Sequence, residues 1–271
     1  MLDGEGAIRD LSTAVPDIGG DVLLPESLAR LRALDPAALP RVEGTPRIGP
    51  CVAGVGKFIC VGLNYSDHAA ESGMPVPREP IIFMKATSSI VGPNDDVVIP
   101  KGSKKTDWEV ELAVVVGRRA SYLSGPERSL DHVAGFAVAN DLSERAFQIE
   151  QSGGQWSKGK SAAGFTPLGP WLVTPDEVDH ARLRLRSWVN GEPRQDSSTA
   201  DLIFDVEHVV WHLSQYLVLE PGDVIVTGTP EGVALSGRFP YLAPGDVVEL
   251  EIDGLGRQRQ TFVAHPDDLT A

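Results

Sequence analysis

The chain has 271 residues, and 42% of them are apolar, which suffices for a sizeable hydrophobic core and excludes a disordered protein. The formal net charge of −14 at pH 7 disfavours nucleic acids and anionic membranes as partners. No stretch approaches about 18 consecutive apolar residues, and the N-terminus lacks the apolar run of a signal peptide, so we predict a cytoplasmic protein.

The first 50 residues differ from the rest of the chain. Leu28, Leu31 and Leu34 recur at helical spacing after Pro25, which predicts a helix over residues 25–34. Residues 47–50 have the composition of a linker. We therefore predict a small N-terminal segment, 1–50, followed by a main domain, 51–271.

From residue 57 onward, short apolar runs separated by glycine and proline predict a strand-rich body. Strands are expected over residues 57–62, 97–100, 109–116, 133–140, 183–190, 224–226 and 247–252, with a hairpin turn at Asn190-Gly191. Helical segments are expected over residues 67–72, 143–151 and 204–218. The pattern predicts a β-dominated α+β fold with few helices.

Two glutamates, Glu109 and Glu111, stand two residues apart in the apolar strand predicted for residues 109–116. Alternation places both carboxylates on one face, roughly 6.5–7 Å apart. A divalent cation would relieve their repulsion, and an oxygen-only ligand set favours Mg²⁺, Mn²⁺ or Ca²⁺. The alternative is an outward-facing pair on a solvated strand. If the two repel, removing Glu109 should leave the metal-free fold at least as stable.

Asp141 follows the next long strand and is a candidate third ligand, or else the N-cap of a following helix. Arg145 and Gln148 would lie one helical turn apart on the same side. An arginine so placed can bind a substrate carboxylate bidentately, although a surface salt bridge is the plainer interpretation.

His68 and Glu71 are three residues apart on the predicted turn of helix after the first main strand. A carboxylate that holds an imidazole makes a general base able to activate water near neutral pH. Surface His–Glu pairs are also common, so the pair alone leaves both interpretations open.

Two loops rich in glycine and proline complete the set of candidates. Residues 155–170 contain Lys158 and Lys160, which could supply local positive charge, but they lack the spacing of a phosphate-binding P-loop. Residues 227–232, which include Thr229, follow a buried strand and form either an oxyanion-binding loop or a plain turn.

Together these stretches resemble the fumarylacetoacetate hydrolase family, in order, from about Lys57 to Phe262. The motifs that carry the resemblance are Gly62-Leu63-Asn64-Tyr65-Ser66-Asp67-His68, Phe83-Met84-Lys85, Trp108-Glu109-Val110-Glu111-Leu112, Asn140-Asp141-Leu142-Ser143-Glu144-Arg145, Lys158-Gly159-Lys160-Ser161 and Thr227-Gly228-Thr229-Pro230. The resemblance implies a mixed β-sheet roll with a small N-terminal domain, usually dimeric. The leading segment starts later than in most members, which indicates a truncated or shortened first domain.

The resemblance also implies the site. It assigns a divalent metal to Glu109, Glu111 and Asp141, with Mg²⁺ expected and Mn²⁺ or Ca²⁺ as substitutes. It makes His68 and Glu71 the water-activating dyad and lets Lys160 stabilise developing negative charge. It places Arg145, Gln148 and Thr229 against a small anionic substrate.

The implied activity is hydrolysis of a carbon–carbon bond in a 2,4-diketo acid, with the leaving carbanion held at the metal as an enolate. Within the family, the layout looks most like hydrolases of acylpyruvates and of 2,4-diketo-3-deoxy sugar acids. The alternatives are an oxaloacetate decarboxylase, a ureidoglycolate lyase, a 2-hydroxyhepta-2,4-diene-1,7-dioate isomerase, or a catalytically inactive metal-binding module. The loops at 162–165 and 231–234 depart from the usual family sequence, most visibly at Glu231, which makes metal binding the firmer expectation and substrate identity the weaker one.

Overall fold

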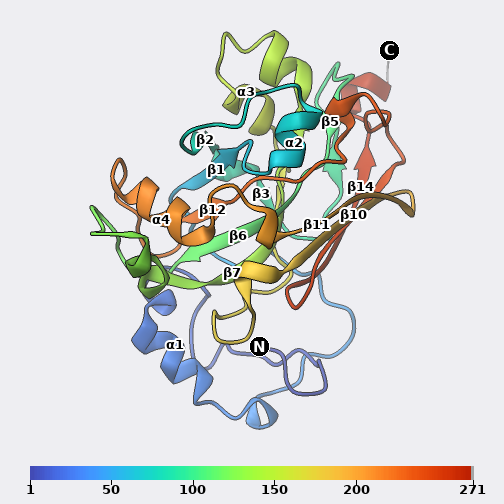
Figure 1. Ribbon diagram of the computed structural model, residues 1–271. Helices are drawn as coiled ribbons and strands as arrows, with labels where there is room; N and C mark the ends of the chain where they lie inside the picture. Colours follow the sequence, from blue (N-terminus) through green and yellow to red (C-terminus); the bar gives the residue numbers. More distant parts are fainter. Residues whose placement is uncertain (270–271) are drawn as a thin grey trace.

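A computed structural model describes residues 1–269 and contains two five-stranded sheets (Figure 1). The first sheet has the strand order β2-β1-β12-β6-β7 and is mixed, since β1 runs parallel to β12 while the other neighbours are antiparallel. Its strands are β1 (Phe58–Gly62), β2 (Ile81–Lys85), β6 (Val110–Val116), β7 (Val133–Asn140) and β12 (Val224–Val226).

The second sheet has the order β11-β10-β13-β14-β4 and packs against the first. Its strands are β4 (Val97–Val98), β10 (Arg184–Val189), β11 (Glu192–Ser198), β13 (Val247–Ile252) and β14 (Gly256–Val263). Two short ladders accompany the sheets, one pairing β3 (Ile90–Val91) with β9 (Thr166–Pro167), the other pairing β5 (Thr106–Asp107) with β8 (Ser143–Glu144). The predicted β-rich α+β roll is therefore confirmed.

Apart from the edge strand β2, the first sheet is buried on both faces, which explains why β1, β6, β7 and β12 are continuous apolar runs. In β6, Val110, Leu112 and Val114 face the second sheet and share its core. The alternate residues Ala113 and Val115 face the other way, into a second core. Glu109 and Glu111 have the same parity as Ala113 and Val115, so alternation directs both glutamates to that second face, as predicted.

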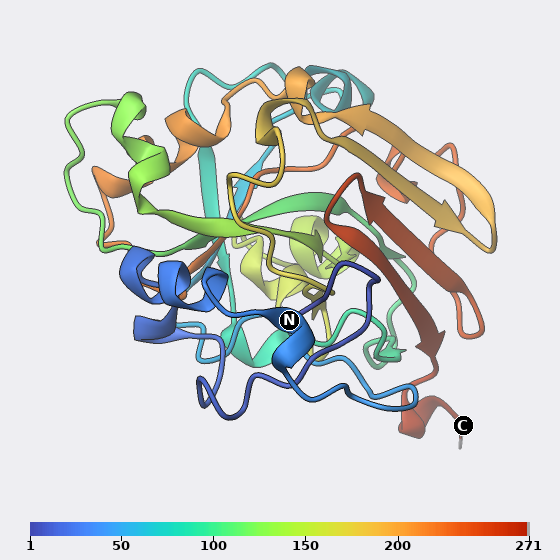
Figure 2. The same cartoon turned by 90° about the horizontal axis from the view of Figure 1, so that it is seen from below.

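The N-terminal segment contains η1 (Gly20–Leu23), α1 (Pro25–Arg32) and η2 (Pro36–Ala38), which confirms the predicted helix. Leu23 is fully buried in the second core, beside Val52 and Phe58. The segment lies at the lower end of the molecule in Figure 1, and Figure 2 shows it extended across that side. The division of the chain at residue 50 stays a prediction.

The remaining helices are α2 (Ser66–Glu71), α3 (Ser157–Lys160) and α4 (Val206–Ser214). Shorter helical turns are η3 (Thr87–Ser89), η4 (Pro126–His132), η6 (His180–Arg182), η7 (Thr199–Asp201), η8 (Ala234–Ser236) and η9 (Pro266–Leu269). None of the helices in residues 1–269 is long and apolar enough to cross a membrane.

One local prediction was correct in part and another was wrong. The helical segment expected over 143–151 forms as a π-helical turn, η5 (Ala146–Glu150), but residues 143–144 form the strand β8 and pair with β5. The lysine loop forms the short helix α3 around Lys158 and Lys160. The sequence analysis also gave no strand for β2 or β14, although both are paired along their length.

Candidate active site

A cavity of about 360 Å³ opens at the end of β6 near α2 and α3. All nine residues singled out from the sequence line it, namely His68, Glu71, Glu109, Glu111, Asp141, Arg145, Gln148, Lys160 and Thr229. They come from five separate stretches of chain, so the two sheets and their connections bring the candidates together at one place.

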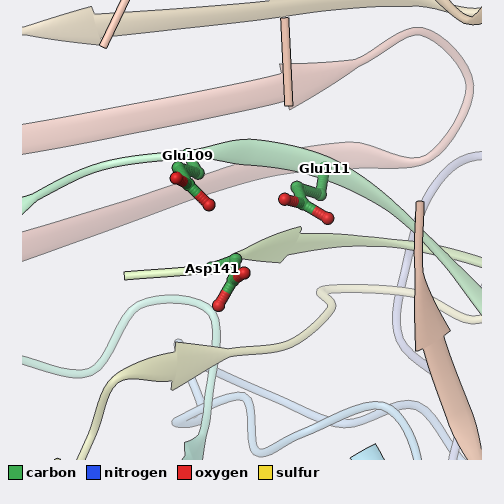
Figure 3. Close-up of side chains that lie close together, drawn as sticks. All are labelled: Glu109, Glu111 and Asp141. Atoms are coloured by element: carbon green, nitrogen blue, oxygen red, sulfur yellow. The ribbon is translucent and has the colours of Figure 1, made fainter. Parts of the chain in front are cut away.

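The three acidic side chains gather through the register of β6 and β7 (Figure 3). Glu111 lies opposite Ala139, and the N–H of Asp141 donates to the carbonyl of Glu109 at 3.0 Å. One carboxylate oxygen from each of Glu109, Glu111 and Asp141 lies within 4.8 Å of the others, and all three residues are buried. Asp141 therefore belongs to an acidic cluster and does not cap the following helical turn, η5, whose N-cap is Arg145.

Two buried lysines bind this cluster. Lys160 Nζ lies 2.6 Å from Glu109 Oε2 and 2.8 Å from Asp141 Oδ2. Lys85 Nζ lies 2.5 Å from Asp141 Oδ1 and also donates to the carbonyls of Leu142 and Phe165, at 3.1 and 2.7 Å. All the donors of Lys85 are thus used inside the protein, which makes it a residue that positions Asp141.

Arg145 is buried beside the cluster and is held from two sides. Its Nε donates to Asp107 Oδ2 at 2.8 Å, and its Nη1 donates to Gln148 Oε1 at 2.9 Å. Its Nη2 lies 2.8 Å from both Asp107 and Glu109 as an ion pair, at angles too bent for a hydrogen bond. The surface salt bridge considered from the sequence is excluded, since Arg145 is only 2% exposed.

The pKa values of Glu109 and Glu111 are shifted in opposite directions. Burial alone would raise the pKa of Glu109, but Lys160 and Arg145 outweigh it and bring the pKa to about 2. Glu111 makes no ion pair with the described residues, although its Oε2 accepts the N–H of Gly228 at 2.7 Å. Burial, together with the charges of Asp141 and Glu109, therefore raises the pKa of Glu111 well above its ordinary value.

The donor set fits a divalent metal. Four buried carboxylates, those of Asp107, Glu109, Glu111 and Asp141, face three buried cations, Lys85, Arg145 and Lys160, which leaves one negative charge uncompensated at Glu111. Three converging carboxylates and no sulfur or imidazole form an oxygen-only set, which suits Mg²⁺ or Mn²⁺ rather than zinc. A divalent cation would be held by Glu109, Glu111 and Asp141.

His68 and Glu71 lie side by side on α2, at the wall of the same cavity. His68 Nδ1 is 3.4 Å from Glu71 Oε2, which is a long contact. With Nδ1 directed at Glu71, Nε2 is the ring nitrogen left for another partner. Glu71 also accepts the N–H of Gly232 at 3.1 Å and pairs with Arg238. Burial would raise the pKa of Glu71, but these partners lower it overall, so the carboxylate is held in its charged form.

Thr229 reaches the cavity from the loop after β12. Its hydroxyl donates to the carbonyl of Val110 at 3.0 Å and accepts from Gln195 Nε2 at 2.7 Å. Gly228 in the same loop has φ +99°, and a Cβ there would lie 2.8 Å from the Cβ of Asn64. Glycine therefore permits the close approach that presents the Gly228 N–H to Glu111.

Helix α3 delivers Lys160 by a close approach of its own. A Cβ on Gly159 would meet the N of Gln148 and the carbonyl oxygen of Glu144, both at 2.4 Å. Glycine at this position lets α3 pack directly on η5, and Lys160 then reaches the carboxylates, whereas Lys158 is exposed and donates to the carbonyl of Gln151.

Several residues of the site received no role from the sequence. Lys85 ends an apolar strand, and a lysine in that setting is a signal that could have identified it. Asp107 stands two residues before Glu109, the same spacing that separates the two glutamates, and this spacing could have assigned it to the same cluster. Gln195 and Arg238 lie in stretches without a distinctive pattern, so their contacts with Thr229 and Glu71 depend wholly on the fold.

Similarity to known proteins identifies the family of this chain. The profile of the fumarylacetoacetate hydrolase C-terminal family matches residues 57–263. The chain belongs to this family. A protein of Burkholderia ambifaria that is provisionally named a hydrolase is 57% identical over 265 residues, 96% of this chain and 93% of its own length.

Two solved structures extend the comparison. Fumarylpyruvate hydrolase of Pseudomonas aeruginosa, in complex with Mn²⁺ and pyruvate, is 29% identical with a TM-score of 0.72, covering 83% of this chain and 99% of its own. A 2-hydroxyhepta-2,4-diene-1,7-dioate isomerase of Mycobacterium marinum is 37% identical with a TM-score of 0.69, covering 78% and 76%. Family and fold are thus established, while hydrolases and isomerases both occur among the similar proteins.

Proposed function

We propose that this protein is a metal-dependent hydrolase that cleaves a carbon–carbon bond in a small 2,4-diketo acid, such as an acylpyruvate or a 2,4-diketo-3-deoxy sugar acid. The observation that carries the proposal is the His68–Glu71 pair on the wall of the cavity that holds the acidic triad. A base for water is required by hydrolysis but not by decarboxylation. The similarity to a fumarylpyruvate hydrolase that binds Mn²⁺ and pyruvate adds support.

The residues that line the cavity have distinct proposed roles. A divalent ion held by Glu109, Glu111 and Asp141 would supply Lewis-acid polarisation of the diketo acid's oxygens when bound. Glu71 holds the Nδ1 proton of His68, which leaves Nε2 to take a proton from the water that attacks the distal carbonyl. The poorly aligned Nη2 of Arg145 has protons to donate to the substrate carboxylate, and Gln148 fixes its orientation.

Lys160 faces the charge that grows during bond cleavage. Its ammonium lies between Glu109 and Asp141, and these carboxylates raise its pKa against the opposing effect of burial, so it stays protonated. A fixed positive charge at this place stabilises an enolate-like transition state more than the neutral ketone that precedes it.

The test is an assay of the purified protein with Mg²⁺ or Mn²⁺ against acylpyruvates, diketo-deoxy sugar acids and oxaloacetate. For each of the first two classes, we expect pyruvate to form at the same rate as the diketo acid is consumed. Decarboxylation of oxaloacetate without hydrolysis of any diketo acid would contradict the proposal. The second candidate, an isomerase, is favoured by the similarity to the Mycobacterium marinum enzyme and would show a change in diene absorbance without release of pyruvate.

A further inference from the structure

The lining of the cavity changes from mainly charged at its inner end to mainly apolar at its mouth. Its inner end holds the acidic triad, Arg145 and Lys160, all nearly fully buried. His68, Gln148 and Thr229 also line the cavity and are buried. The less buried part of the wall consists of the apolar Met74, Phe83, Ile149, Trp156 and Leu235, together with Glu71 and Ser72. Met74 and Ile149 are 48% and 52% exposed, which places them at the mouth. The polar end is therefore deep, and a substrate's outer half meets mainly hydrocarbon and aromatic rings.

The aromatic part of this wall is well defined. The rings of Phe83 and Trp156 meet edge to face with centroids 5.5 Å apart, and Lys160 Nζ lies 5.2 Å from the centroid of Phe83. Trp156 packs on β1 at Gly62, where a Cβ would lie 2.5 Å from its ring. These contacts fix the two rings directly beside the charged end, so they border any group that extends outward from it.

Positive charge is confined to the inner end. Among the described lysines and arginines, those that line the cavity are Arg145 and Lys160, and both are in ion pairs with the buried carboxylates. Arg238 adjoins the wall through Glu71, but its guanidinium is shared between Glu71 and Glu231. One substrate carboxylate thus finds a cation at the inner end, and a second one farther out would find apolar side chains and the charge of Glu71.

We infer that the enzyme selects monoanionic 2,4-diketo acids with a short, uncharged acyl group and discriminates against diketo acids with a second carboxylate. The inference rests on the proposed function and specifies its substrate class. A terminal carboxylate would lose part of its water against Phe83 and Trp156 without gaining a partner, whereas an alkyl or methyl-terminated group gains contact area. A cavity of about 360 Å³ suits a diketo acid with a short acyl group.

A matched pair of substrates tests the inference, since 2,4-dioxooctanoate and 2,4-dioxooctanedioate differ in their terminal group alone. We expect kcat/KM for the monoacid to exceed that for the diacid on the order of 100-fold, because the diacid leaves a charge unpaired. Equal or faster hydrolysis of the diacid would overturn the inference. Release of pyruvate from either one separates this result from failure of the proposed function.

A binding experiment gives an answer even if no hydrolysis occurs. The 2-oxo acids 2-oxooctanoate and 2-oxooctanedioate lack the second keto group and so cannot be cleaved. Calorimetric titration of each into the full chain with Mg²⁺ should give a lower Kd for the monoacid. Tighter binding of the diacid would contradict the inference whatever the reaction catalysed.

A single substitution at the mouth should change the selectivity. Met74→Lys places a cation at the mouth of the cavity, away from Arg145 and Lys160 at its inner end. Met74→Gln is an uncharged control of similar length. We expect Met74→Lys to raise the diacid-to-monoacid ratio of kcat/KM about tenfold, and Met74→Gln to leave the ratio unchanged. An equal gain in both variants would show that charge does not set the preference, and the inference would fail.

Discussion

The charged groups of the cavity and those on the outer side of the second sheet are of the same chemical kinds but lie in opposite surroundings. On β10, β11, β13 and β14, Arg184 pairs with Asp196, Arg186 with Glu251, and Arg257 with Glu249, at 2.6 to 3.1 Å, with side chains 23 to 55% exposed. In the cavity, Lys160 and Glu109 lie 2.6 Å apart with side chains at most 6% exposed.

Distance therefore does not distinguish the two regions, whereas hydration does. Water screens the pairs of the sheet and can replace either partner, so each contributes little to stability. In the cavity, the loss of one partner leaves the other as an uncompensated charge away from water. Such costly buried sets are found mainly where chemistry requires them, and this supports the proposed active site.

The largest expected effect is that of metal removal. With EDTA present, the hydrolysis of a 2,4-diketo acid should fall by more than about 10³-fold, because the charge at Glu111 and the substrate oxygens lose their common cation. Added Mg²⁺ or Mn²⁺ in excess should restore the rate. Steady-state assays before and after chelation measure this, and full activity in EDTA would refute the role of the acidic triad.

The loss of His68 should follow in size. His68→Ala should lower hydrolysis by about 10²–10⁴-fold, the usual scale for a general base. Metal affinity, followed by calorimetry, should stay nearly the same. His132→Ala is the matched control, since His132 is only partly buried and does not line the cavity. If oxaloacetate decarboxylation fell as far as hydrolysis, His68 would be a structural residue.

The two glutamates should respond differently in the metal-free protein. Glu109→Gln leaves Lys160 and Arg145 short of an anion and should lower the free energy of unfolding by about 3–5 kcal/mol. Glu111→Gln removes a buried carboxyl group that has no cation partner among the described residues and should be neutral or stabilising. This revises the sequence-based expectation that removing Glu109 relieves repulsion. Urea unfolding of both variants, with EDTA present, measures the difference, and equal losses would contradict it.

The smallest effect belongs to the sheet. Asp196→Asn should barely change the urea midpoint at pH 7, and salt should abolish what remains. The hydrogen bond from Arg184 lowers the pKa of Asp196. The stability from this pair is therefore present above the unfolded pKa of about 4 and is lost as the pH falls through the lower folded value. A large change at Asp196 would show that exposure does not separate the two regions.

Much of the site could be predicted because its residues adjoin strands. Glu109 and Glu111 share a face by alternation, and Asp141 ends the next strand, which pairs with the first. Local spacing also brought His68 and Glu71 together, and likewise Arg145 and Gln148, since i,i+3 contacts need no tertiary information.

The opposite pKa shifts of Glu109 and Glu111 could not be predicted from the sequence. They depend on Lys160 and Arg145, which reach Glu109 from other parts of the chain, and on the absence of such a partner at Glu111. The helical segment expected at residues 143–151 forms only in part for a similar reason. The pairing of β8 with β5 is a contact made across the chain, and it overrides local preference.

The parallel pairing of β1 with β12 has a consequence for how the protein is made. Phe58 pairs with Val224, and Asn64 binds the carbonyl of Thr227, so the centre of the first sheet joins residues more than 160 positions apart. During synthesis β1 and β6 are made before β12, so the strand edges that pair with β12 stay unpaired until it emerges. Such long-range pairing slows folding and leaves apolar strand edges exposed in the nascent chain, where chaperones bind and aggregation begins.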